Sequence, residues 1–162
     1  MEQAIDLHFD LRNVLTPLGE YQRTFDFLRD AEMLATALDD QRRLGWVYAY
    51  RTAHFLFMGN HDRVIEAGQC ALALAGPQGD IACQVAARFF LGTVYYNLGE
   101  YRRVIDDIRQ TIALLQDELL YERFGLIGIA SVWCRTILVQ SLAECGVFSE
   151  AMAHGEEAVR IA

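Results

Sequence analysis

The 162-residue sequence has no lysine, only two prolines and no apolar stretch long enough to cross a bilayer. Its 14 basic residues are all arginine and face 22 acidic residues, so the formal net charge is −8. General nucleic-acid binders and binders of anionic membranes need a basic surface, so we expect neither kind of partner. The longest uncharged apolar run, residues 124–134, is about half of the roughly 20 residues that a membrane-spanning helix requires.

The sequence also lacks an export signal, because residues 1–6 have neither a basic start nor an apolar core. This favours a cytoplasmic protein. The four cysteines, Cys70, Cys83, Cys134 and Cys145, are widely spaced and form no Cys-x-x-Cys pair. We therefore expect reduced cysteines that lie on helices and in the protein core, and no disulfide or zinc site.

No phosphate-binding glycine loop, nucleophile elbow or zinc-protease motif is present. Asp6, His8 and Asp10 suggest a metal site at first sight. On a helix, however, His8 points about 200° away from each aspartate, so the three side chains would not converge. We expect no metal, no cofactor and no catalytic activity in this segment.

What the sequence does contain is a repeat. Four similar four-residue turn segments occur at residues 18–21, 58–61, 98–101 and 145–148, each with a glycine at its second position. The turn glycines are therefore 40, 40 and 47 residues apart. A fixed period with helical flanks is typical of a solenoid, in which each helix pair buries its apolar face against its neighbours.

Apolar periodicity predicts helices between the turns. Val104, Ile105, Ile108, Ile112 and Leu115 recur at spacings of three and four and so form one stripe. No alternating β-branched run predicts a strand. We expect an all-α fold with eight helices, at residues 2–17, 21–38, 40–58, 62–75, 80–98, 102–116, 118–145 and 148–161. The seventh could be kinked or split at Gly125 and Gly128.

The stretch 91–101, Leu-Gly-Thr-Val-Tyr-Tyr-Asn-Leu-Gly-Glu-Tyr, resembles the first helix and turn of a tetratricopeptide repeat, and the resemblance extends over the whole chain. It implies a right-handed superhelical α-solenoid of about four antiparallel helix pairs. The repeats would span residues 2–38, 40–75, 80–116 and 118–162 of a single domain, 1–162. The family prefers a small residue seven positions before the turn glycine, which Gly92 and Thr52 provide but Arg12 and Val139 do not.

The spacing of 40 exceeds the family's usual repeat of about 34 residues and implies longer helices or longer links. Such long repeats are similar to those of bacterial signalling ATPases. The run 18–74 in particular resembles the C-terminal repeat region of bacterial proteins that join a class III adenylate or guanylate cyclase to an ATPase module. This resemblance implies a segment of a larger bacterial signalling protein.

In the family, the first helix of each pair lines a concave groove that holds a peptide. Transferring that register selects an aromatic and neutral stripe, in which the best candidates for a partner groove are Trp46, Ala49, Phe57, Phe89, Thr93, Tyr96, Asn97, Trp133 and Gln140. The same stripe includes Phe9, Asn13, Ala53, Thr136 and Glu144. Because aromatic residues at helical spacing are also common in cores, a purely structural role for this stripe stays open. The family's carboxylate clamp is not expected, because Arg51, Arg88 and Arg135 lie off the stripe.

Two functions from different classes remain. The first is a protein-interaction or sensor module that binds a peptide, a protein segment or a sister domain in the aromatic groove and regulates an attached signalling enzyme. The second is a structural spacer or self-association module without a ligand. The apolar residues Ala151, Met152, Val159 and Ile161 near the C-terminus favour stacking on a further repeat or on a copy of the same chain.

Overall fold

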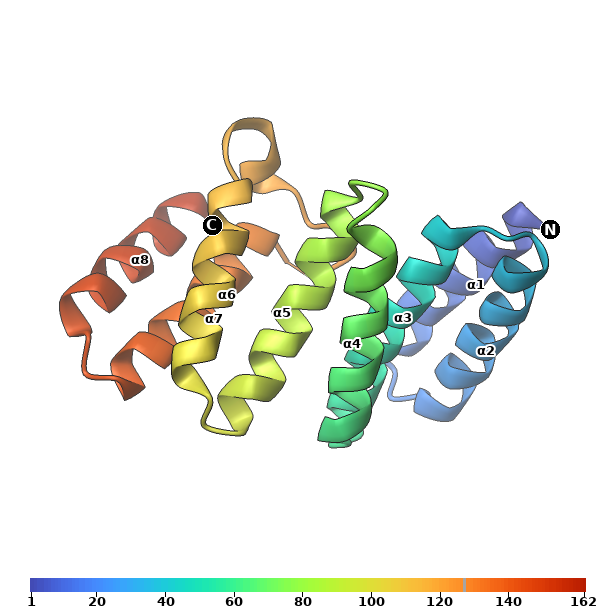
Figure 1. Cartoon of the computed structure of the whole chain (residues 1–162), viewed down its shortest axis with the longest axis horizontal. Helices are drawn as coiled ribbons and strands as arrows, with labels where there is room; N and C mark the ends of the chain where they lie inside the picture. Colours follow the sequence, from blue (N-terminus) through green and yellow to red (C-terminus); the bar gives the residue numbers. More distant parts are fainter. Residues whose placement is uncertain (127) are drawn as a thin grey trace. The chain divides into compact units, whose positions relative to one another are not determined.

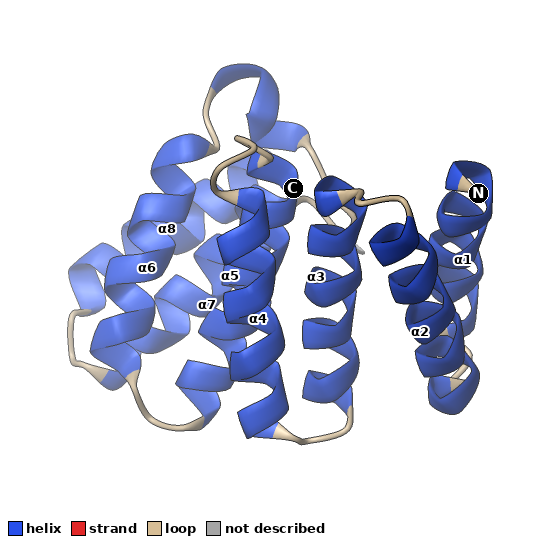
Figure 2. Ribbon diagram, turned by 45° about the vertical axis from the view of Figure 1, so that its right-hand side comes forward, coloured by secondary structure: helices blue, strands red, loops and turns tan. Residues whose placement is uncertain are grey.

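The computed structural model describes residues 1–126 and 128–162, and in these residues the chain is all-helical with no strand. Its described elements are α1 (Glu2–Leu15), α2 (Tyr21–Ala37), α3 (Gln41–Phe57), α4 (His61–Ala75), α5 (Ile81–Asn97), α6 (Tyr101–Leu114), the short 3₁₀ helix η1 (Asp117–Tyr121), α7 (Ala130–Glu144) and α8 (Phe148–Ile161) (Figures 1 and 2). The predicted all-α repeat fold is confirmed. None of the helices in the described residues has the length and apolar character needed to cross a membrane.

The chain divides into two compact units, Met1–Ala87 and Arg88–Ala162, with the boundary inside α5. In the first unit, α1 packs on α2, α2 on α3 and α3 on α4. In the second unit, α7 packs against both α6 and α8. Short turns join most consecutive helices. Helices joined in this way are antiparallel neighbours, as expected for stacked helical hairpins.

Each predicted turn glycine adopts a left-handed backbone conformation. The φ angles of Gly19, Gly59, Gly99 and Gly146 lie between +68° and +79°. In each turn the next amide reaches back to the carbonyl five residues earlier, as from Asn60 N to Phe55 O at 3.0 Å. Glycine carries no Cβ penalty in this conformation, so it ends one helix and reverses the chain toward the next.

Polar caps begin several of the helices. The side chain of Asp40 accepts a hydrogen bond from the Arg43 amide at 3.0 Å, and that of Asp80 accepts one from the Cys83 amide at the same distance. Caps of this kind satisfy amides that the first turn of a helix leaves without an intrahelical partner.

Small side chains form the contacts between helices in the first unit. Ala31 and Ala35 of α2 pack on Val47 of α3 in a buried cluster. A second cluster joins α3, α4 and the first half of α5 and consists of Ala49, Ala71, Ala75, Cys83 and Ala87. Small residues let helix backbones approach closely, and larger neighbours such as Trp46 and Leu72 close the sides of the second cluster.

The core of the second unit contains the stripe predicted on α6. Val104, Ile108 and Leu115 are fully buried, and Ile105 and Ile112 nearly so. Gly92 of α5 lies directly against Ile108, and a Cβ atom at Gly92 would be only 3.1 Å from Cδ1 of that side chain. The small residue at position 92 therefore lets α5 and α6 pack closely.

The helix expected at residues 118–145, which Gly125 and Gly128 could kink or split, is not one helix. In its place the chain forms η1, residues 122–126 and 128–129 are not helical, and α7 begins only at Ala130. Phe124 and Gly125 have φ angles of +47° and +73°, which no α-helix accommodates. The Ala130 amide donates to the Glu122 carbonyl at 3.0 Å and closes this loop, which accounts for the longer spacing of 47. Ile127 lies outside the described residues.

Candidate functional site

The stripe predicted on α7 is open to solvent. Trp133 is 40% exposed, and Thr136, Gln140 and Glu144 are exposed beside it. Their spacing of three to four residues places them along one side of the helix. The other sides of α7 carry buried residues such as Leu138 and Leu142 and pack against α6 and α8. Trp133 is thus the one large aromatic on the exposed stripe of α7.

Two neighbours hold the Trp133 indole in place. Phe89 of α5 is buried and meets Trp133 edge to face, with ring centroids 5.3 Å apart and planes at 86°. On another side the backbone of Gly128 lies so close to the indole that any Cβ at that position would clash with it. The exposed ring is therefore fixed before any partner arrives, which lowers the entropic cost of binding.

The α5 side of this surface is partly polar. Thr93 is half-buried and its hydroxyl donates to the Phe89 carbonyl at 3.0 Å, whereas Asn97 is exposed. Tyr96 is half-buried, and its ring centroid is 5.4 Å from that of Tyr101. Desolvation and the nearby Glu144 carboxylate raise the pKa of the Tyr96 hydroxyl above its ordinary value.

We call these residues of the second unit the α5–α7 face. Its members are Phe89, Thr93, Tyr96, Asn97, Trp133, Thr136, Gln140 and Glu144. The aromatic contact between Phe89 and Trp133 and the interaction of Tyr96 with Glu144 join the two helices. The face combines one exposed aromatic ring with amides, hydroxyls and a carboxylate. Such a mixture suits recognition of a peptide by a flat ring and by hydrogen bonds.

The corresponding stripe on α3, in the first unit, is largely closed. Ala49 and Ala53 have no exposed surface. Phe57 is exposed at the end of α3 and stacks on Tyr21 of α2, with centroids 6.1 Å apart. The predicted groove residues of this helix therefore pack mainly within the unit.

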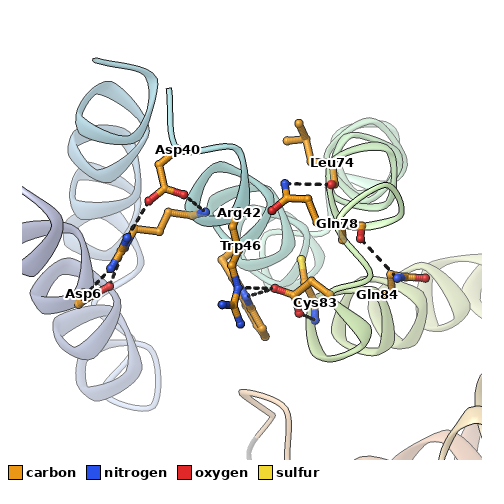
Figure 3. Close-up of polar contacts among 11 residues, drawn as sticks. Asp6, Asp40, Arg42, Trp46, Leu74, Gln78, Cys83 and Gln84 are labelled. Atoms are coloured by element: carbon orange, nitrogen blue, oxygen red, sulfur yellow. Dashed lines mark hydrogen bonds and ion pairs between the residues drawn. The ribbon is translucent and has the colours of Figure 1, made fainter. Parts of the chain in front are cut away.

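Trp46 is anchored to the start of α5 by a hydrogen bond. Its indole Nε1 donates to the Asp80 carboxylate at 3.2 Å. The same carboxylate oxygen accepts from Arg42 Nε at 3.1 Å (Figure 3). Figure 3 shows Trp46 and Arg42 together near Cys83, at the beginning of α5. Since the Asp80 side chain is almost buried and also caps α5, these contacts tie α3 to α5.

A second polar network ties α1 to α3. Arg43 donates to both carboxylate oxygens of Asp6 at 3.0 Å and to Asp40 at 2.7 Å (Figure 3). The hydrogen bond to Arg43 lowers the pKa of Asp6. Desolvation opposes ionisation of Asp40, but its hydrogen bonds with Arg43 prevail and lower its pKa as well. The Arg43 guanidinium gains from both partners, so its pKa is raised.

The sequence prediction missed a buried cation in the first unit. Arg12 of α1 is buried, and its guanidinium carbon lies 4.3 Å from the ring centroid of Tyr50 in α3. Arg12 also donates to Asn13 at 2.8 Å, and Phe9 meets Tyr50 edge-on at 5.1 Å. A signal was present, because Arg12 occupies the repeat position at which Thr52 and Gly92 are small. Its long side chain reaches an aromatic ring of the next hairpin.

The remaining reactive side chains do not converge. Asp6 binds Arg43, whereas His8 packs on the Phe27 ring at 5.4 Å. In residues 1–126 and 128–162, no group of three His, Cys, Asp or Glu side chains could hold a metal ion.

The cysteines are free, and two of them are buried as expected. Burial raises the pKa of the thiols of Cys83 and Cys134 to about 12, which leaves both protonated and unreactive. Cys145 is different. It follows α7 and is exposed, so the expectation that it lies in the core is wrong.

The α5–α7 face is the strongest candidate, because it has an exposed aromatic ring held by its neighbours. No protein-family model matches the chain, and no curated protein is significantly similar to it.

Proposed function

We propose that this chain is a protein-interaction module of the tetratricopeptide type and that its α5–α7 face binds a peptide segment. The observation that carries the proposal is the exposed Trp133 ring, which lies edge to face with Phe89 and against the Gly128 backbone. Exposed, rigid aromatic rings commonly supply a large share of the binding energy at protein interfaces.

The chemistry of the face indicates the kind of peptide. An apolar or aromatic side chain of the partner would pack on the Trp133 indole. Gln140 and Asn97 are exposed amides and can pair with the backbone of an extended peptide. Glu144 lies at the end of the same stripe, and the chain has a net charge of −8, so a peptide with a basic residue is favoured over an acidic one.

The proposed partner is a protein segment or a sister domain, and not nucleic acid or membrane. If the resemblance to repeat regions of bacterial cyclases holds, binding would regulate an attached signalling enzyme in the cytoplasm. On this proposal the chain itself carries out no chemistry.

A random-peptide display library can test the proposal directly. Peptides selected on the wild-type chain are synthesised with a fluorescent label, and their Kd values are measured by anisotropy. Trp133→Ala should raise Kd about 30-fold, because loss of an interface hot spot costs about 2 kcal/mol. Gln140→Ala should raise it less.

The matched control is Phe57→Ala, which removes an exposed aromatic from the first unit. It should leave Kd unchanged. The proposal fails if the library yields no binder, or if Trp133→Ala and Gln140→Ala both leave Kd at the wild-type value. In that case a spacer or self-association role becomes the better explanation.

A further inference from the structure

Helix α8 exposes an apolar stripe. Met152 is 64% exposed and Val159 is 79% exposed, with the half-buried Gly155 between them. These residues border a surface groove of about 880 Å³ between α7 and α8, which is also lined by Val139 and Phe148. Large apolar side chains that gather on one face of a helix usually mark a contact surface.

The repeat shows what covers this stripe elsewhere in the chain. Met152, Gly155 and Val159 lie 6, 9 and 13 positions after their turn glycine. The residues at the same three positions in α6 are Ile105, Ile108 and Ile112, which are all buried. In α2 they are Phe25, Leu28 and Glu32, and in α4 they are Ile65, Gly68 and Leu72, which are all buried or half-buried. Only in α8 is this stripe exposed among the described helices.

The contacts of α2 identify the kind of helix that covers the stripe. Phe25 packs against His54 of α3 at a ring distance of 5.1 Å, and Glu32 forms a two-pronged ion pair with Arg51 of α3. Ala31 and Ala35 pack on Val47, also of α3. The covering surface is thus the stripe 12, 8 and 5 positions before the next turn glycine, which in α3 is Val47, Arg51 and His54.

Among the helices that the structure describes, one exposes this covering stripe. The residues 12, 8 and 5 positions before the turn glycine are all buried in α5 and in α7. They are Ala87, Leu91 and Val94 in α5, and Cys134, Leu138 and Ser141 in α7. In α1 they are Leu7, Leu11 and Val14. Leu7 is 56% exposed, Val14 is 63% exposed and Leu11 is half-buried. Helix α1 therefore presents the partner stripe that α8 lacks.

We propose that α8 of one molecule packs on α1 of a second copy, in the same register that joins α2 to α3. Three pairings follow from the register. Met152 would meet Val14, as Phe25 meets His54. Val159 would meet Leu11, which replaces the ion pair of Glu32 and Arg51 by an apolar contact.

The third pairing places Ala158 against Leu7, as Ala31 packs on Val47. A small residue again faces a larger one, so the two helices can approach closely. Each contact uses one α8 and one α1, which makes the interface heterologous. Heterologous contacts between identical copies build rings or open filaments.

The oligomeric state of the 162-residue chain tests this pairing. The wild-type mass from light scattering after gel filtration should rise with protein concentration above the 18.4 kDa of one chain. Val159→Glu should abolish association, because a carboxylate would face Leu11 in an apolar contact. Leu7→Glu should abolish it equally, from the other side of the interface.

A mixture of the two variants provides the sharpest readout. The Val159→Glu chain keeps an intact α1, and the Leu7→Glu chain keeps an intact α8. Together they can form one good contact and no more, so a heterodimer of about twice the monomer mass should appear. Both changes are at exposed positions, and circular dichroism should show unchanged helix content and melting temperature.

The matched control is Met33→Glu on α2, an exposed apolar position outside both stripes, and it should associate like the wild type. A wild-type chain that stays monomeric at high concentration overturns the proposal. If the Leu7→Glu chain still dimerises, the contact is between two α8 helices and the proposal is overturned. A mixture of the two variants that remains monomeric overturns it as well.

Discussion

The two tryptophans occupy the same position of the repeat, 13 residues before the turn glycine, but they have different surroundings. Trp46 in the first unit is half-buried, packs on the alanine cluster of α3 and α4, and donates to Asp80. Trp133 in the second unit is 40% exposed and touches Phe89 at its edge. Among the described residues, no acceptor takes a hydrogen bond from its indole. The same residue at the same position can thus be a structural anchor or a binding surface.

The difference has a physical cause in the helix that follows. Trp46 has a hydrogen-bond acceptor in the cap residue of α5, because the Asp80 carboxylate accepts from both the Cys83 amide and the indole. Beside Trp133 lies the loop that precedes α7, which offers the backbone of Gly128. The position in the repeat therefore sets the direction of the side chain. The neighbouring segment sets whether that side chain is hydrogen-bonded within the fold or left exposed.

Alanine substitutions should separate the two tryptophans most strongly. Trp46→Ala should lower the free energy of unfolding by about 3 kcal/mol, because it leaves a cavity beside buried alanines and removes one of the three donors to Asp80. Trp133→Ala should lower it by only about 1 kcal/mol, since much of the ring is already in water. Urea denaturation followed by circular dichroism measures both values. Equal losses would contradict the assignment of an anchor and a surface.

Phenylalanine substitutions isolate the hydrogen bond. Trp46→Phe should cost about 1 kcal/mol, because the buried Asp80 carboxylate loses one of its donors. Trp133→Phe should change the stability by less than about 0.5 kcal/mol, since no donated bond is lost. The same denaturation experiment compares the two variants. If Trp133→Phe proves the more costly change, the indole of Trp133 has a structural partner and the comparison fails.

His54, in the first unit, should make the free energy of unfolding depend on pH. Burial lowers the pKa of His54 below its usual value, and the nearby Arg12 and Arg51 lower it further. The unfolded chain then binds a proton that the folded chain does not, so stability is full above about pH 6.5 and falls as the pH drops below it.

The measurement is the urea midpoint at a series of pH values from about 7 down to about 5. His54→Phe should reduce the loss of stability on acidification, because the substituted side chain binds no proton in the unfolded chain. His61→Gln, at the half-buried first position of α4, is the control and should keep the wild-type slope. A His54→Phe chain with an unchanged slope would show that His54 is not the responsible group.

Much of the local structure could be predicted from the sequence. The stripe on α6 from Val104 to Leu115 is buried as expected, because helical periodicity is a local property of neighbouring side chains. The helix ends at Gly19, Gly59, Gly99 and Gly146 were also predictable, since these positions need a left-handed backbone. The prediction failed at residues 118–145, where apolar side chains fit a helix but Phe124 and Gly125 adopt positive φ angles.

The candidate site was predictable only in part. The repeat register placed Trp133 and Gln140 on one stripe, and the structure shows that stripe exposed. The same register selected Ala49, which the structure buries against Ala71 and Cys83. Whether a stripe is open depends on the helix packed across it, and no spacing within a single helix carries that information.

The sequence by itself determined the fold class, the helix pairs and their turns, because these follow from local backbone preferences and from the period of apolar residues. Only the tertiary structure decided that Trp46 is held by Asp80 and that Arg12 lies on the Tyr50 ring. These contacts join residues that are distant in the chain. Their energies depend on how close packing brings side chains of different helices together.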